Sequence, residues 1–221
     1  MILSYLDLRQ SFAKGVLRML GWRFKAYSDV NLPKGELDRF PPKFITFGEP
    51  HTHISDIGLM MLFFSYFRLP TVTFPVSKKY FNAVSRPWLS WVGAIPVDTS
   101  KGAKNNLVAH LVEKVQKAER LILHIPPSGT RKKTDFWRSG FYHIALQAQI
   151  PVIPAYLDSA TKTFGYGEPI YMSGNVKADM DKIRAFYMDK RGQVPANESI
   201  IKLAAELATS SGADLSAMAA N

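Results

Sequence analysis

Residues 49–56, which read Glu-Pro-His-Thr-His-Ile-Ser-Asp, form a polar segment between two apolar stretches. The stretch at 44–48 (Phe-Ile-Thr-Phe-Gly) precedes it, and an apolar run at 57–67 follows it. A short buried strand, a proline breaker and an apolar helix, in this order, are typical of a strand end that presents reactive side chains on a rigid scaffold. We therefore predict a strand over 44–48, a helix over 56–68 and a functional loop between them.

His51 and Asp56 are the candidate catalytic residues of this loop. Asp56 falls where the chain turns into the helix, so its carboxylate is expected both to cap the helix and to reach back to the imidazole. Such a contact fixes the tautomer of His51 and leaves the other ring nitrogen free to take a proton. The same pattern also fits an ordinary loop histidine followed by a helix-capping aspartate, and spacing alone does not decide between the two.

A metal-dependent hydrolase built on His51 and His53 is an alternative interpretation. On an extended segment these two side chains point to the same side, as two metal ligands would. Asp56 lies five residues after His51, so on an extended segment it would point to the opposite side. No second cluster of ligands is evident in the sequence. The other histidines stand singly, as His110, His124 and His143. We therefore predict no metal site.

Composition narrows the class of protein. The chain has 221 residues, of which 47% are hydrophobic, enough for the core of one domain. It contains no cysteine, which excludes disulfides, thiolate nucleophiles and thiolate metal sites and fits an intracellular location. The net charge of +10 favours acidic partners: nucleic acid, anionic lipid or an acidic protein. Because no recognition helix, zinc finger or aromatic single-strand motif is present, we predict no nucleic-acid partner.

Residues 2–20 are the candidate membrane contact. Apolar residues recur there at near-helical spacing and are interleaved with Arg9, Lys14 and Arg18, which predicts a basic amphipathic helix. Such a helix either packs on its own domain or lies on an anionic membrane surface. The longest apolar run, 57–67, is too short to span a bilayer, and no secretory cleavage pattern follows the N-terminus. We expect no transmembrane helix.

The rest of the chain alternates between apolar runs and amphipathic stretches, which predicts an α/β fold. Strands are predicted over 71–76, 93–98, 121–125 and 150–156, with a partner strand at 163–171. Helices are predicted over 80–92, 101–120, 140–149, 179–190 and 200–207. Lys78 follows the strand 71–76, at the end of a strand where ligands collect in α/β sheets. The chain divides into an N-terminal amphipathic helical segment (1–28), one catalytic domain (29–191) and a C-terminal helical or flexible tail (192–221).

A second polar turn follows the predicted strand 121–125. Ser128, Gly129, Thr130 and Arg131 offer backbone amides, hydroxyls and a guanidinium in one turn, which are the elements of an anion-binding site. Lys132 and Lys133 make the local field more positive still. Turns of this composition are common, so the turn by itself is a weak indication.

Four blocks, taken together, resemble the glycerophospholipid acyltransferase family, which includes the 1-acylglycerol-3-phosphate (lysophosphatidate) acyltransferases. They lie in family order across residues 45–157, and the resemblance to short bacterial members continues to residue 187. The blocks are His51-x-x-x-x-Asp56, Gly93-Ala-Ile-Pro-Val-Asp98, Pro127-Ser-Gly-Thr-Arg131 and Ile150-Pro-Val-Ile-Pro154. The resemblance implies a glycerol-3-phosphate acyltransferase-like α/β domain with a mixed, largely parallel sheet flanked by helices.

The resemblance further implies an O-acyltransferase of phospholipid biosynthesis. A fatty acyl group would pass from a thioester donor, acyl-ACP or acyl-CoA, to a hydroxyl of a lysophospholipid or glycerol phosphate acceptor. His51 would be the general base and Asp56 would orient it, with no acyl-enzyme and no cofactor besides the donor. The acceptor phosphate would bind at residues 128–131, where Arg131 can hold two oxygens at once. An apolar tunnel between the 57–67 helix and the sheet would set the acyl chain length.

Two positions depart from the family pattern. Ser128 stands where the third block usually has Glu, and Thr99 stands where the second usually has Arg. Our hypothesis is that Lys78, Lys101 or Lys104 supplies the missing cation, or that the acceptor is not lysophosphatidate. A catalytically degenerate, lipid-binding member is the remaining alternative. Whether the protein is an active acyltransferase or a degenerate member, we expect a peripheral, monotopic attachment to the cytoplasmic side of the membrane through residues 2–20 and Trp22.

Overall fold

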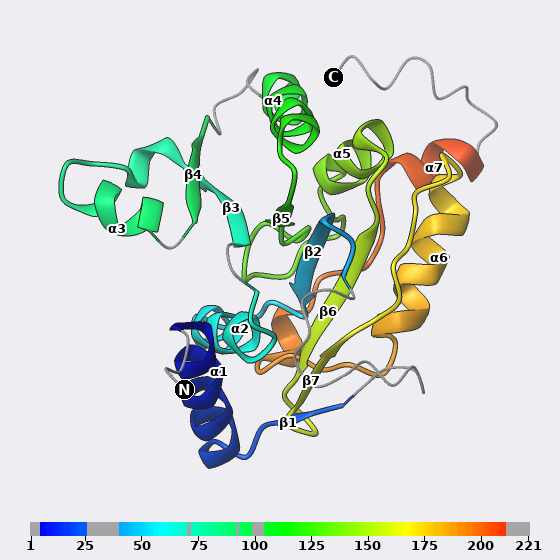
Figure 1. The fold of residues 1–221 in the computed structure, drawn as a ribbon. Coiled ribbons are helices and arrows are strands. Elements are labelled where there is room, and N and C mark those ends of the chain that lie inside the picture. The colour runs from blue at the N-terminus through cyan, green and yellow to red at the C-terminus, as the bar shows by residue number, and fades with distance from the viewer. Residues whose placement is uncertain (1–4, 26–39, 70–71, 92, 99–103, 211–221) are drawn as a thin grey trace.

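A computed structural model describes residues 5–25, 40–69, 72–91, 93–98 and 104–210 of the chain. Within these residues, seven strands form a sheet in the order β1-β7-β6-β2-β5-β3-β4. The strands are β1 (Arg23–Phe24), β2 (Lys43–Glu49), β3 (Val72–Ser77), β4 (Ala94–Val97), β5 (Leu121–His124), β6 (Val152–Asp158) and β7 (Thr163–Tyr166). Helices cover both faces of this sheet (Figure 1), so the predicted α/β class is confirmed.

The helices follow the strands along the chain. They are α1 (Tyr5–Met19), α2 (Ser55–Tyr66), α3 (Ser85–Trp91), α4 (Lys104–Lys117), α5 (Gly140–Ala148), α6 (Val176–Tyr187) and α7 (Ala205–Ser210), with 3₁₀ turns at Lys78–Tyr80 and Pro195–Asn197. The predicted helix over 80–92 is wrong at its start, because α3 begins only at Ser85. The short strand β1 was not predicted.

The sheet is largely parallel, as predicted. Strand β2 pairs in parallel with β5 and β6, and β3 pairs in parallel with both β5 and β4. On the other side of the sheet, β7 runs antiparallel to β6, and β1 pairs with β7. The carboxyl ends of β6, β2, β5, β3 and β4 therefore meet at one edge. The loops after β2 and β5 both leave from that edge.

The connections of β2 and β5 run in opposite directions. From β2 the chain passes through α2 to β3, whereas from the neighbouring β5 it passes through α5 to β6 on the far side of β2. Two adjacent parallel strands whose connections diverge in this way make a topological switch point, where open α/β sheets bind their ligands. The two polar loops predicted from the sequence flank this point.

Each face of the sheet carries its own core. Phe44 points to the face covered by α1 and α2, and its neighbour Ile45 points to the face covered by α4, α5 and α6, as the alternation of a strand requires. Gly48 continues the first face, and a Cβ there would lie 1.7 Å from the Cε of Met60. The missing side chain therefore lets α2 pack closely on the end of β2.

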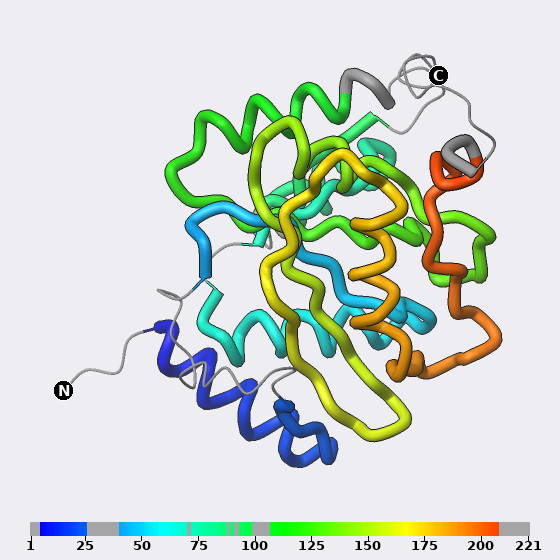
Figure 2. The backbone as a smooth tube through the Cα atoms, turned by 90° about the vertical axis from the view of Figure 1, so that its right-hand side faces the viewer, coloured from blue at the N-terminus to red at the C-terminus, as the bar shows by residue number. Residues whose placement is uncertain are grey.

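Helix α1 confirms the amphipathic helix predicted at 2–20, within the residues described. It packs beside α2 in both views (Figures 1 and 2), with Ala13 and Leu17 buried between them. Its outer side carries exposed apolar residues, which are Tyr5, Leu8, Phe12 and Met19, and the exposed Leu20 directly follows the helix. Trp22, which we expected at a membrane surface, is instead buried in the core on this face. No helix in the described ranges has both the length and the apolar character needed to cross a bilayer.

Candidate active site

His51 and Asp56 face each other across the loop between β2 and α2. The Nδ1 atom of His51 lies 3.4 Å from Oδ2 of Asp56, within ion-pair range and slightly beyond a usual hydrogen bond. Only 15% of the His51 side chain and 6% of the Asp56 side chain are exposed. Because Asp56 can only accept when ionised, the contact selects the tautomer with the proton on Nδ1. The Nε2 atom of His51 is then the basic nitrogen.

The carboxylate of Asp56 is held by several donors. Oδ2 accepts the backbone N–H groups of Thr52 and His53, each at 2.8 Å, and Oδ1 accepts from the Gln193 side chain at 2.7 Å. Burial pushes the pKa of Asp56 upward, but the hydrogen bonds from His51, these amides and Gln193 outweigh it and bring the pKa below its usual value. Asp56 is therefore ionised at neutral pH.

The predicted capping role of Asp56 is wrong. Helix α2 begins at Ser55 and its N-cap is Ile54, whose side chain accepts no capping hydrogen bond. Asp56 lies inside the first turn, and its carboxylate binds amides of the loop that precedes the helix. The carboxylate thus organises the loop around His51, and the predicted contact with the imidazole is present.

Residues 192–197 brace the same loop from the other side. The N–H of Val194 donates to the hydroxyl of Thr52 at 3.1 Å, and the Asn197 side chain donates to the Thr52 carbonyl at 3.2 Å. At Gly192 a Cβ would lie 2.6 Å from the Thr52 side chain, so only glycine allows this approach. The contacts come from residues that the sequence analysis assigned to the C-terminal tail.

His53 turns away from this centre. Its side chain is exposed, and its Nδ1 lies 2.8 Å from the hydroxyl of Ser55. Among the residues that the structure describes, no three His, Asp or Glu side chains gather in a group that could bind a metal ion. The parallel orientation that the metal alternative requires for His51 and His53 finds no support in these contacts.

Glu49, the last residue of β2, links the two predicted loops. Its Oε2 accepts the N–H of His51 at 2.8 Å, while its Oε1 accepts the hydroxyl of Ser128 at 2.8 Å and the N–H of Ser128 at 3.3 Å. Both side chains are buried, and burial raises the pKa of Glu49 above its usual value. Glu49 is not among the site residues predicted from the sequence, although an acidic residue that ends an otherwise apolar strand was a signal for it.

The turn after Ser128 carries the predicted anion-binding groups. Gly129 has a φ of +62°, and a Cβ there would lie 2.6 Å from Nε of Arg138, so this guanidinium packs on the turn itself. Arg131 is exposed, and it forms no ion pair with the residues described. Thr130 accepts the N–H of Lys132 at 3.2 Å, which tightens the turn. Two guanidiniums, one of them not predicted, therefore stand at this turn.

The lysines proposed as substitutes for the missing cation are less well placed. Lys78 follows β3, two strands from β2, and its Nζ lies 3.7 Å from the carboxylate of Asp98. Thr99 and Lys101 fall outside the described residues, and Lys104 begins α4 with a side chain that is likewise not described. The local geometry favours Arg138 over Lys78 for this role.

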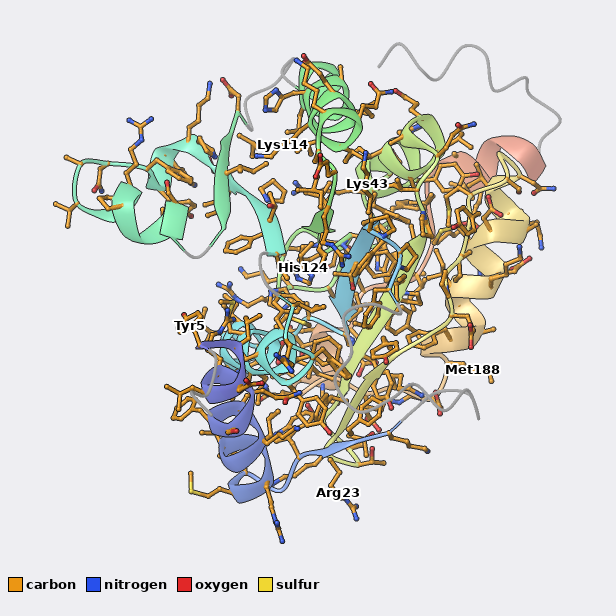
Figure 3. All side chains as sticks on the ribbon, in the orientation of Figure 1. Tyr5, Arg23, Lys43, Lys114, His124 and Met188 are labelled. Atoms are coloured by element: carbon orange, nitrogen blue, oxygen red, sulfur yellow. The ribbon has the colours of Figure 1, made fainter. Side chains whose placement is uncertain are left out.

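His124, labelled in Figure 3, is the last residue of β5, and its ring packs against α2. Its ring packs edge-on against Phe64 with 5.3 Å between centroids, and within the described residues its buried Nδ1 has no hydrogen-bond partner. Burial, with a smaller contribution from the charge of His51, lowers the pKa of His124 to about 3. His124 is therefore uncharged at neutral pH.

A cavity of about 460 Å³ adjoins the loop on the face covered by α6. Glu49, Pro50, Trp137 and Tyr187 line it, together with Met188 and Ile201. The space between α2 and the sheet, where we expected an apolar tunnel, is filled by buried side chains, namely Leu59, Met60, Phe63 and Phe64. Among the described residues, this cavity therefore gives the loop open volume on the α6 face.

Comparisons with known proteins bear on this site. A family model described as Acyltransferase matches residues 49–158, about half of the chain, and this range contains both loops. The solved structure of the 1-acyl-sn-glycerophosphate (LPA) acyltransferase PlsC from Thermotoga maritima is similar at 16% identity, with a TM-score of 0.48, covering 80% of this chain and 74% of that one. None of the curated proteins matches the chain.

Proposed function

The chain belongs to the acyltransferase family, and we propose that it moves a fatty acyl group from a thioester donor to a hydroxyl of a lysophospholipid or glycerol phosphate-type acceptor. The donor is acyl-carrier protein or coenzyme A carrying the acyl chain. The single observation that carries the proposal is the arrangement of two loops at one switch point. The loop after β2 holds His51 against Asp56, and the loop after β5 carries the cationic turn at Arg131.

In the proposed reaction, Nε2 of His51 takes the proton of the acceptor hydroxyl as its oxygen attacks the thioester carbonyl. The new C–O bond forms a tetrahedral intermediate, which collapses with cleavage of the C–S bond. The imidazolium of His51 returns its proton to the departing thiolate, so the enzyme ends as it began. Asp56 stabilises the imidazolium while it exists. No covalent acyl-enzyme is required, which agrees with the absence of cysteine.

The acceptor phosphate would bind at the turn after Ser128. Arg131 can hold two phosphate oxygens with its parallel N–H groups, and the guanidinium of Arg138 lies against the same turn at Gly129. This pair supplies the cation that the second sequence block lacks at Thr99. An acceptor with a phosphate next to a free hydroxyl therefore fits the proposed site.

We further propose peripheral attachment to an anionic membrane through α1. The exposed apolar side of this helix includes Leu8 and Phe12, and the exposed Lys14 and Arg18 lie on the same helix. Buried apolar side chains and basic residues both contribute to binding at an anionic interface. The net charge of +10 would also attract an acidic carrier protein.

An acyl-transfer assay tests the function directly. Purified protein is incubated with a panel of lysolipids and a labelled acyl donor, either acyl-ACP or acyl-CoA. The extracted lipids are then separated and identified by mass spectrometry. We expect labelled diacyl product from a phosphate-bearing acceptor, and a higher KM for that acceptor in Arg138→Ala. Binding of lysolipids without product from either donor would contradict the proposal and point to the degenerate, lipid-binding alternative.

A further inference from the structure

We propose that Glu49 is a positioning residue, and that its carboxylate fixes the loop of His51 and the turn of Arg131 relative to each other. The inference rests on the proposed function for its kinetic consequences, but its geometric content stands apart from the reaction. Glu49 itself takes no part in the catalytic step. Its role is to hold two other groups at a fixed separation.

The carboxylate of Glu49 uses each of its oxygens for a different loop. Oε2 receives the N–H of His51, whose ring is the proposed base, and Oε1 receives the N–H and the hydroxyl of Ser128. Ser128 directly precedes the turn at Gly129. A single rigid group thereby spans the two loops that leave the adjacent strands β2 and β5.

The surroundings make these bonds costly to lose. Glu49 and Ser128 are 4% and 2% exposed, so water does not readily replace either partner. The residues described contain no Lys or Arg that forms an ion pair with Glu49. Removing the carboxylate would leave buried donors on both loops without an acceptor. Each loop would then move to find a new partner, and the distance between His51 and Arg131 would change.

Because the two side chains touch, they can be exchanged. The hydroxyl of Ser128 lies 2.8 Å from Oε1 of Glu49, and combining Glu49→Ser with Ser128→Glu keeps the total side-chain volume. The carboxylate would then reach the same buried space from the other loop. A role in positioning predicts that this exchange restores part of the activity that Glu49→Ser removes.

Asp179 provides a matched control. It is fully buried, and its carboxylate also accepts one N–H and two hydroxyl groups, from Ser173 and Tyr142. It lies on α6 and joins no residue of the two loops through these bonds. Asp179→Asn therefore measures how the fold alone responds when a buried carboxylate that accepts three hydrogen bonds is lost.

The experiment compares Glu49→Gln, Glu49→Ser, the exchange variant Glu49→Ser with Ser128→Glu, and Asp179→Asn, each shown to be folded by thermal melts. We expect Glu49→Gln to lower kcat/KM for acyl transfer about 10²-fold, as a displacement of about 1 Å at a reacting group does, and Asp179→Asn to leave it within about 3-fold of wild type. The exchange variant should recover about 10-fold over Glu49→Ser. Activity of Glu49→Gln close to wild type, or no recovery on exchange, would overturn the proposal.

A second readout needs no activity. In ¹H–¹⁵N spectra, Glu49→Gln should shift the amide signals of both His51 and Ser128, and Asp179→Asn should shift neither. A shift confined to one of the two loops would overturn the proposal even if the wild type transfers no acyl group. Failure of the proposed function and failure of the positioning role are therefore separable.

Discussion

At the scale of single residues, the charge of Asp56 determines what His51 can do. Four hydrogen-bonding groups keep this carboxylate ionised despite its burial, and its Oδ2 faces Nδ1 of His51. An ionised acceptor at this position holds the proton on Nδ1 and would stabilise the positive charge that forms on the ring during catalysis. The hydrogen bonds from Thr52, His53 and Gln193 would thus affect the proposed chemistry through the Asp56 side chain.

Replacing Asp56 with Asn tests this dependence. The amide keeps the size of the side chain but removes the charge and permits the wrong tautomer of His51. We expect kcat to fall on the order of 10³–10⁴-fold while KM for the acceptor stays nearly constant. Steady-state kinetics with variable acceptor will check this. A rise in KM with unchanged kcat would mean that Asp56 shapes the acceptor site and does not serve the base.

The site residues that could be predicted from the sequence differ in one respect from those that only the structure revealed. His51, Asp56 and Arg131 lie in short motifs whose spacing is visible along the chain. Glu49 and Arg138 act through contacts across 79 residues and across the Gly129 turn, respectively, and such contacts exist only after folding. Gln193 reaches Asp56 from 137 residues away.

At the scale of elements, α1 has one side packed on the protein and another side with exposed apolar residues. Its inner side packs on α2, with Leu17 buried and Asp7 paired to Arg68 at 3.1 Å. The apolar spacing in the sequence predicted the helix, but it did not show which apolar residues face inward. Phe12 was one of the residues that set the predicted helical spacing, and it is 67% exposed. Sequence periodicity fixes the helix, whereas only packing fixes its rotation.

Point substitutions on the outer side of α1 test the membrane proposal without disturbing the core. Deleting residues 2–20 would also remove the buried Leu17 and expose the side of α2 on which α1 packs. We expect Leu8→Ser, Phe12→Ser and Met19→Ser together to weaken binding to anionic liposomes about 100-fold or more, since each buried apolar side chain is worth about 1.5–3 kcal/mol.

Met188→Ser is the matched control for this test. Met188 is 75% exposed and directly follows α6, on the opposite side of the molecule from α1 (Figure 3). Flotation of liposomes will measure both proteins, and the control should bind as wild type does. If the triple variant floats with the liposomes as well as wild type does, α1 is not the membrane contact.

At the scale of the whole molecule, the alternation of strands and helices predicted the α/β class, and the family resemblance implied a largely parallel sheet. That sheet places the two loops together. What the sequence did not show was strand order, since β5 enters between β2 and β3 after β4 has formed the edge. That order creates the switch point next to His51. Loops separated by about 75 residues become neighbours because of it.

Stability should also depend on pH through His124. Its folded pKa of about 3 lies below the ordinary value of 6.5, so the unfolded chain takes up a proton first as the pH falls. The free energy of unfolding should therefore be highest above pH 6.5 and should decline as the pH falls toward about 3, by up to about 1.4 kcal/mol per pH unit from this group.

Urea denaturation at several pH values will measure this slope. In His124→Phe the decline between pH 6.5 and 4.5 should be shallower than in wild type, because the variant lacks the titrating ring. His143, whose pKa burial also lowers, is present in both proteins and cancels in the comparison. Equal slopes in the two proteins would show that the His124 ring does not resist protonation in the fold.

The most direct measurement compares His51→Ala with His53→Ala in the acyl-transfer assay. The two histidines are two residues apart, but only the ring of His51 faces Asp56, while the ring of His53 contacts Ser55. We predict that His51→Ala lowers the rate by about two to four orders of magnitude and that His53→Ala changes it only a few-fold. Acyl transfer that survives His51→Ala, or that is lost equally in His53→Ala, would contradict the account.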